Sequence, residues 1–220
     1  MRAVDRGRYV AHPYHAESYV DSPLPIGHGQ TISAPHMHAA CCERLAGQLR
    51  PGAHVLDVGS GSGYLTAVLA QLVRPGGVVQ GVELVPQLAE RSQGALEADP
   101  AVRAARGDGV TVVVRTADAH WGAPEHAPYD AIHVGAAAES VPSALVEQLA
   151  RGGRMIIPVG PHGWTQVLKC IDKDAAGHVT ERDLMGVQYV PLVRTGKPPP
   201  PAQQPEPATP QQQGGAAEAQ

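Results

Sequence analysis

The sequence predicts an α/β domain built on a mostly parallel, doubly wound sheet, with an antiparallel strand pair near its C-terminal end. Two observations lead to this prediction. Over residues 55–72 an apolar strand is followed by a glycine-rich turn and the start of a helix. This order is typical of a strand–helix crossover unit. After it, continuously apolar strands alternate with helical patterns, as in parallel sheets covered on both faces. The 220 residues suffice for one domain with a full core.

The glycine turn consists of Gly59, Gly61 and Gly63. It follows the strand 55–58 and starts a helix, so bare backbone N–H groups would face a ligand. Its G-x-G-x-G spacing is shorter than the G-x-G-x-x-G of dinucleotide oxidoreductases, and Asp57 stands just before it. An acid there suits a cationic amino-acid moiety such as that of S-adenosylmethionine. The same turn also occurs as an ordinary connection in α/β proteins.

The composition excludes several function classes. The formal net charge of -4 and the pI of about 6.2 give no basic field for nucleic acid or acidic lipid. No run of about 18 apolar residues predicts a membrane span, and the first residues lack the apolar core of a signal peptide. The three cysteines have no metal-binding spacing, so we expect no metal, reduced thiols and a cytoplasmic location.

The first 36 residues indicate a loop-rich lead-in that lies against the domain. Prolines and glycines at 21–30 argue against a regular helix there. Ser33 and Pro35 then predict the start of a helix. By itself, Ser33 also fits a helix cap, and His38 a surface or capping histidine.

Two acids follow strands that we expect beside the glycine turn. The strand 78–83 ends in Glu83, about 20 residues beyond the last glycine, where crossover folds present a carboxylate to ribose hydroxyls. The strand 110–115 leads to Asp118, which is placed to accept from an adenine amino group, while Ala119 offers its backbone N–H to the ring. Taken singly, Glu83 also fits a solvated strand-end acid, and Asp118 a plain turn.

The second half of the chain continues the pattern. Residues 129–134 indicate a buried strand, and the small residues after it leave room either for a ligand or for close packing. Strands at 154–159 and 166–171 follow, the second alternating as in an antiparallel pair. A last strand at 187–192 contains Pro191, which favours an edge position. Helices are expected at residues 65–72, 86–98 and 141–149.

We therefore expect one domain over residues 1–196. From residue 197 the chain consists mainly of Pro, Gln, Ala, Gly and Glu, without an apolar anchor. Residues 197–220 should therefore be disordered.

Taken together, the sequence resembles the protein-L-isoaspartate (D-aspartate) O-methyltransferase family from Arg6 to Leu192. The Thr-Ile-Ser-Ala-Pro-His-Met run at 31–37 is the most specific match, because general methyltransferases lack it. The other matching stretches are residues 21–23, 26–27, 56–63, 128–138, 152–154, 158–160, 184–187 and 189–192.

The resemblance implies a Rossmann-like, class I methyltransferase fold with S-adenosyl-L-methionine as donor and S-adenosyl-L-homocysteine as product. The implied acceptor is the free α-carboxylate of an L-isoaspartyl residue, and also D-aspartyl residues, in damaged proteins and peptides. The methyl ester would then collapse without the enzyme to a succinimide that reopens partly to aspartate. A carboxylate is already a nucleophile at neutral pH, so rate should come from orientation. We expect such a repair enzyme to be a monomer.

The resemblance also assigns site residues, with Ser33 as the active-site serine that orients the acceptor carboxylate. The expected cofactor-binding residues are Thr31, Ile32, Ser33, His38, Asp57, Gly59, Ser60, Gly61, Glu83, Leu84, Asp118 and Ala119. The expected substrate-binding residues are Ser33, Val134, Gly135, Tyr189, Val190 and Pro191. The last three would form an extended edge that pairs with the peptide main chain by strand addition.

The sequence departs from the family pattern in three places. The helical segment that the family carries ahead of residues 6–10 is missing, and Ala117 and Ala119 stand where the family has glycines. Beyond Leu192 the match ends, so family contacts from that region are not carried over. Two other functions stay open: a nicotinamide oxidoreductase, which the glycine spacing disfavours, and a non-catalytic protein that binds S-adenosylmethionine or isoaspartyl peptides.

Overall fold

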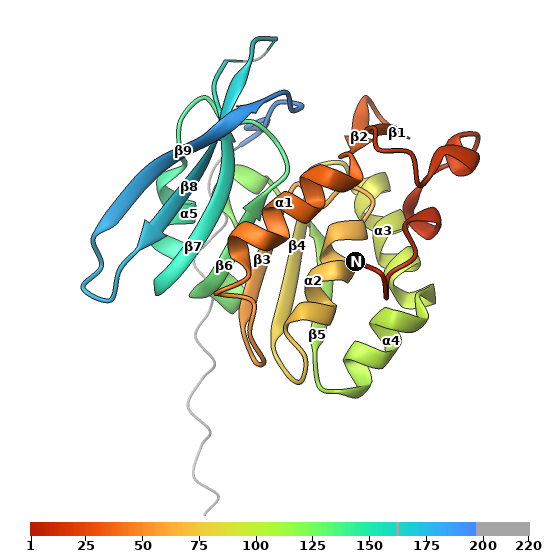
Figure 1. Cartoon of the computed structure of the whole chain (residues 1–220), viewed down its shortest axis with the longest axis horizontal. Helices are drawn as coiled ribbons and strands as arrows, with labels where there is room; N and C mark the ends of the chain where they lie inside the picture. The colour runs from red at the N-terminus through yellow and green to blue at the C-terminus, as the bar shows by residue number, and fades with distance from the viewer. Residues whose placement is uncertain (162, 197–220) are drawn as a thin grey trace, which may run out of the picture.

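The computed structural model describes residues 1–161 and 163–196, and a single large sheet forms its centre. The strands of this sheet are β3 (His54–Val58), β4 (Val78–Glu83), β5 (Thr111–Thr116), β6 (Tyr129–Val134), β7 (Leu149–Val159), β8 (Gln166–Lys173) and β9 (Val179–Val187). They lie in the order β5-β4-β3-β6-β7-β8-β9 (Figure 1). The first five in this order run parallel, while β8 and β9 are antiparallel additions at one edge. The predicted fold class is therefore confirmed.

Helices cover both faces of the sheet (Figure 1). They are α1 (Pro35–Leu45), α2 (Tyr64–Leu72), α3 (Pro86–Ala98), α4 (Pro100–Gly107) and α5 (Ser143–Gln148). Val55 and Ala131 of the central strands pack in the cluster that includes α1 and α2. Their neighbours Leu56 and Ile132 pack in the opposite cluster, with Leu145 of α5. Burial on both faces explains why these strands are continuously apolar.

The lead-in contains a hairpin where only loops were expected. Its strands are β1 (Leu24–Gly27) and β2 (Gln30–Ile32), paired antiparallel. Leu24, Ile26 and Ile32 are buried, but such short strands give too few positions for an alternating pattern to be recognised.

The helix cap of α1 also differs from one interpretation of the sequence. The N-cap residue is Ala34, without a side-chain bond. Asp21 instead reaches the helix start, where its Oδ1 accepts from the His36 backbone N at 3.0 Å. Ser33 is therefore not the cap, and its hydroxyl is not needed to satisfy the helix terminus.

The last strand was placed wrongly from the sequence. It is β9, at Val179–Val187, and not residues 187–192. Most of β9 is exposed on both faces, so it shows no apolar alternation and its pairing with β8 defines it. The helix α4 was not anticipated either. The expected disordered tail at 197–220 lies outside the described residues.

Two further expectations concern the whole chain. Within the described residues, none of the helices combines the length and apolar character needed to cross a bilayer. Cys41, Cys42 and Cys170 are all free, in agreement with the expected thiols.

Candidate active site

The carboxyl ends of β3, β4 and β6 meet at the glycine turn. Gly59, Gly61 and Gly63 have φ angles of 71°, 53° and 86°, a region that glycine tolerates far better than other residues. The turn is tied to the end of β4, because Gly59 N donates to Val82 O at 2.8 Å. A Cβ at Gly135, just after β6, would lie 3.0 Å from Gly59 O. Bare backbone on both segments therefore opens this end of the sheet to a ligand.

Glu83 lies directly at the glycine turn. Its Oε2 accepts from Gly61 N at 2.9 Å, and its Oε1 from Val85 N at 3.0 Å. The carboxylate is buried, but each of its oxygens has a further lone pair. Glu83 therefore has lone pairs available beside the turn, and its role as an acceptor for ligand hydroxyls stays a prediction.

Asp57 forms a buried pair with His133, its register partner on β6. Asp57 Oδ1 lies 2.9 Å from His133 Nδ1, and Asp57 Oδ2 accepts from Thr66 Oγ1 at 2.6 Å. Burial lowers the pKa of His133, but hydrogen bonds to Asp57 and Cys41 outweigh it and raise the pKa to about 10. His133 is therefore a cation that balances the charge of Asp57, so Asp57 is less suited to a ligand cation than the sequence suggested.

His38, on α1, is the other buried histidine of the site. Burial, with the charges of His133 and Arg6, lowers the pKa of His38 to about 3, so the ring is neutral. Arg6 Nη1 donates to His38 Nδ1 at 3.4 Å, because a guanidinium has no acceptor. The ring proton is then on Nε2, and His38 offers a neutral N–H donor to the site.

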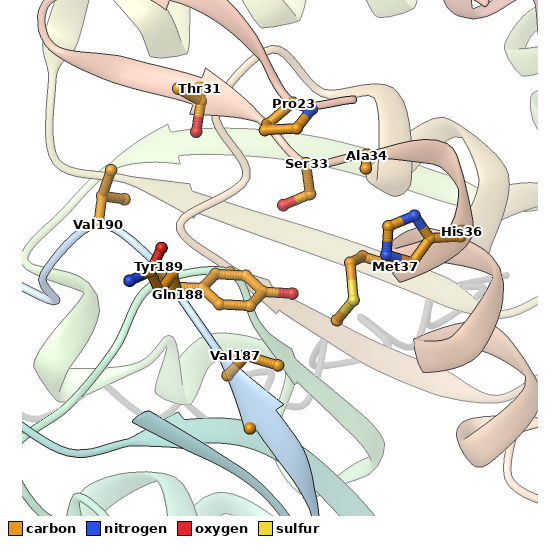
Figure 2. Close-up of a pocket in the computed structure, with 12 residues that line it drawn as sticks. Pro23, Thr31, Ser33, Ala34, His36, Met37, Val187, Gln188, Tyr189 and Val190 are labelled. Carbon is orange, nitrogen blue, oxygen red and sulfur yellow. The ribbon is translucent and has the colours of Figure 1, made fainter. Parts of the chain in front are cut away.

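Ser33 lies where two cavities meet. One, of about 30 Å³, adjoins the glycine turn. The other, of about 280 Å³, lies between the start of α1 and the chain after β9 (Figure 2). Thr31, Ser33 and Gly135 line both. Figure 2 shows the Ser33 hydroxyl directed into the larger cavity, toward the side where the Tyr189 ring lies.

The smaller cavity brings together most of the expected cofactor-binding residues. Its lining consists of Thr31, Ile32, Ser33, His38, Asp57, Gly59, Ser60, Gly61, Ser62, Tyr64, Leu65, His133 and Gly135. The larger cavity is lined by four of the expected substrate-binding residues, Ser33, Gly135, Tyr189 and Val190. Segments that are more than a hundred residues apart along the chain therefore converge on Ser33.

The residues at the glycine turn fit a nucleoside that carries an amino acid. Ser60 Oγ is buried without a partner within the described residues, and an unsatisfied hydroxyl costs about 1–3 kcal/mol, so a ligand atom would relieve it. Glu83 can accept from hydroxyls, and Gly59 and Gly61 expose backbone. The cavity of about 30 Å³ at the turn is too small to enclose a whole nucleoside.

Six predicted site residues do not line either of the two cavities. Pro191 lines a separate one, and the other five are Glu83, Leu84, Asp118, Ala119 and Val134. Asp118, the expected adenine acceptor, is engaged by the chain after β9: its Oδ2 accepts from Thr195 N at 2.7 Å. An adenine amino group would have to share or replace this contact. Ala119, beside it, is buried and begins the short 3₁₀ helix Ala119–Trp121.

Sequence reasoning missed three residues that shape the site. A histidine inside a buried strand was a signal that could have been used, because such a side chain needs a polar partner. That the partner of His133 is Asp57 follows only from the register of β3 and β6. Arg6 and Gln166 gave no such signal. Arg6 contacts His38 from the lead-in, and Gln166 accepts from Tyr189 N at 2.8 Å.

Comparisons with known proteins show which family the sequence matches. The sequence model of the family described as "Protein-L-isoaspartate(D-aspartate) O-methyltransferase (PCMT)" matches residues 1–197. The protein-L-isoaspartate O-methyltransferase of Triticum aestivum is 50% identical over 192 residues, which are 87% of this chain and 81% of that protein. The Caenorhabditis elegans enzyme of the same name is 45% identical over 192 residues, 87% of this chain and 82% of that protein.

A solved structure shows the same likeness in three dimensions. It is a Plasmodium falciparum protein assigned as a protein-L-isoaspartate O-methyltransferase, in complex with S-adenosyl-L-homocysteine. It superposes with a TM-score of 0.75 at 35% identity and covers 88% of each chain. The sequence matches and the fold thus agree, and the chain belongs to the protein-L-isoaspartate(D-aspartate) O-methyltransferase family.

Proposed function

We propose that this enzyme transfers a methyl group from S-adenosyl-L-methionine to the free α-carboxylate of L-isoaspartyl residues. The reaction would take place beside the Ser33 side chain. The observation that supports this assignment is the place of Ser33 on the common wall of the two cavities. A donor at the glycine turn and an acceptor in the larger cavity would meet beside its hydroxyl. The named relatives favour this repair activity over a non-catalytic binding protein.

The residues of the glycine turn would hold the donor. S-adenosylmethionine supplies a methyl group on a positively charged sulfur. Glu83 would accept from the ribose hydroxyls, and the N–H of neutral His38 would donate to the amino-acid carboxylate. Gly59 and Gly61 let the ligand approach the backbone, and Ser60 would gain the partner that it lacks.

Ser33 would orient the acceptor. The isoaspartyl carboxylate needs no general base, because it is ionised at neutral pH. What the site must provide is alignment, which is worth several orders of magnitude in rate. The Ser33 hydroxyl, released from helix capping by Asp21, would donate to one carboxylate oxygen and leave the other free to react.

The chain after β9 would hold the peptide main chain. Gln188, Tyr189 and Val190 line the larger cavity together with Gly186 and Val187, the last two residues of β9. Pairing along such a segment recognises backbone and not side chains. That suits a repair enzyme, because isoaspartyl residues arise in different sequence contexts but share the same kinked backbone.

The proposal extends to the enzyme's setting. We infer a monomer, because all proposed site residues come from one chain. The free cysteines suit the reducing cytoplasm. The net charge of -4 gives no general attraction to nucleic acid.

A methyl-transfer assay tests the proposed function. The purified chain is incubated with methyl-labelled S-adenosylmethionine and either an isoaspartyl peptide or the same peptide with normal aspartate. We expect base-labile label on the isoaspartyl peptide only. Equal labelling of both peptides, or none of either, would overturn the proposal.

A further inference from the structure

We propose that Gln166, a buried residue of β8, is a positioning residue that holds the peptide-binding segment in shape before the substrate arrives. This inference rests on the proposed function, because it concerns the segment that would pair with the isoaspartyl peptide. Gln166 contacts that segment from β8 and lines neither of the two cavities at Ser33.

The side-chain amide of Gln166 takes the place of a neighbouring strand. Its Oε1 accepts from Tyr189 N at 2.8 Å, and its Nε2 lies 3.5 Å from Tyr189 O. The same Nε2 lies 3.5 Å from Pro161 O. One amide thus serves both the N–H and the C=O of Tyr189, as a paired strand would. Gln166 is only 2% exposed, so water does not compete for these contacts.

Among residues 1–161 and 163–196, the sheet offers Tyr189 no backbone partner. β8 begins at Gln166, which pairs with Val187, the last residue of β9. Two residues farther on, the ladder has ended. Gly160 leaves space for Gln166, because a Cβ at position 160 would lie 3.1 Å from the Cα of Gln166. The side chain of Gln166 is therefore packed into a place where it continues the ladder by one step.

This anchor decides which edge of the segment stays free. Backbone N–H groups of an extended chain alternate between its two edges. With Tyr189 N held by Gln166, the N–H groups of Gln188 and Val190 belong to the other edge. Neither has a partner within the described residues, and both residues line the larger cavity. The far end of this other edge is occupied, because Val190 O accepts from Ala137 N at 2.8 Å and Leu192 N donates to Ala137 O at 2.7 Å. The N–H groups of Gln188 and Val190 are therefore what this edge leaves for a peptide.

The test compares Gln166→Met with Gln80→Met. Gln80 is also a buried glutamine of the sheet, at 1% exposed, and its amide donates to Gly81 O away from Ser33. For Gln166→Met we expect the KM for an isoaspartyl peptide to rise about tenfold. Its kcat should stay within about twofold, and its Kd for S-adenosylhomocysteine should not change. For Gln80→Met we expect no change in this KM.

A second readout does not depend on activity. Hydrogen exchange of the Tyr189 amide should accelerate in Gln166→Met, while the amides of the β8–β9 ladder stay protected. If wild type does not methylate the peptide, the proposed function fails, whereas loss of protection at Tyr189 still tests the anchor. Unchanged exchange at Tyr189, or an unchanged KM in an active enzyme, would overturn the inference.

Two further variants separate positioning from folding. Gln166→Glu keeps an acceptor for Tyr189 N, so we expect its KM to lie closer to wild type than that of Gln166→Met. Gln166→Asn keeps the amide but is one methylene too short, and it should behave like Gln166→Met. Unfolding of both Gln166→Met and Gln166→Asn would show that the residue maintains the fold and would overturn the positioning role.

Discussion

The two sides of Ser33 are built in different ways. The donor side consists mainly of consecutive residues at the end of β3, with Glu83 and Gly135 added by its two neighbouring strands. The acceptor side combines the start of α1 with the chain after β9, which lie at opposite ends of the described sequence (Figure 2). The donor side is held by parallel strands and a buried ion pair. The acceptor side is held by single side chains such as Gln166.

This difference indicates that the two sides bind different kinds of ligand. A donor that is the same in every cycle can be bound by a fixed turn in the middle of the sheet. An acceptor that comes with many different proteins needs a surface that reads backbone, at an open edge. We therefore expect substitutions on the donor side to change stability and cofactor affinity, and substitutions on the acceptor side to change turnover.

The largest effect should come from His133→Leu, beneath the donor side. It removes the cation that faces Asp57 at 2.9 Å and leaves a buried carboxylate unpaired. We expect the free energy of unfolding to fall by about 3–5 kcal/mol, measured by urea denaturation. His12→Leu, at an exposed histidine, is the control. A loss below about 1 kcal/mol, as for a surface pair, would contradict the buried ion pair.

Ser33→Ala should have the next largest effect, on the acceptor side. Without the hydroxyl the carboxylate loses alignment, so we expect kcat for the isoaspartyl peptide to fall about 100-fold. The Kd for S-adenosylhomocysteine, measured by calorimetry, should be nearly unchanged. Ser143→Ala, at the exposed start of α5, serves as the control. Equal loss of turnover and cofactor affinity would remove the distinction between the two sides.

Glu83→Ala, on the donor side, should weaken cofactor binding more than turnover. It removes the acceptor beside the glycine turn and the contact to Gly61 N. We expect the Kd for S-adenosylhomocysteine to rise about tenfold, as for loss of a charge-assisted hydrogen bond. Glu90→Ala, on the exposed face of α3, should leave this Kd unchanged. A cofactor titration unaffected by Glu83→Ala would exclude the residue from the donor site.

The last prediction concerns the pH dependence of stability. The pKa of His38 is lowered to about 3 in the folded chain, below its ordinary value of about 6.5. Between these values the unfolded chain binds the proton and the folded chain does not, so stability should fall as pH drops from 6.5 toward 3. His38→Gln should flatten this part of the profile in urea denaturation. An unchanged slope would show that His38 is not a buried neutral ring.

His133 should act in the opposite direction. Its pKa is raised to about 10 in the folded chain, so its stabilising effect is complete below about pH 6.5 and is lost as pH rises through 10. The two buried histidines thus narrow the pH range of stability from opposite ends.

The sequence predicted the donor side better than the acceptor side. The glycines and Glu83 lie in short segments whose local pattern fixes their structure, and the structure brings them together. The pairing of Asp57 with His133 was not predicted. The hairpin β1–β2 and the strand β9 escaped prediction, because one is too short and the other too exposed for a periodic pattern. Contacts between distant segments, such as those of Arg6 with His38 and Thr195 with Asp118, depend on tertiary structure and left no sequence signal.

The most direct test of the central claim is a crystal structure with S-adenosylhomocysteine and an isoaspartyl peptide. We predict that the sulfur lies at the glycine turn, that the peptide carboxylate lies in the larger cavity, and that Ser33 Oγ is within hydrogen-bond distance of that carboxylate. A carboxylate bound away from Ser33, or a peptide that does not contact the main chain at Gln188–Val190, would contradict the account.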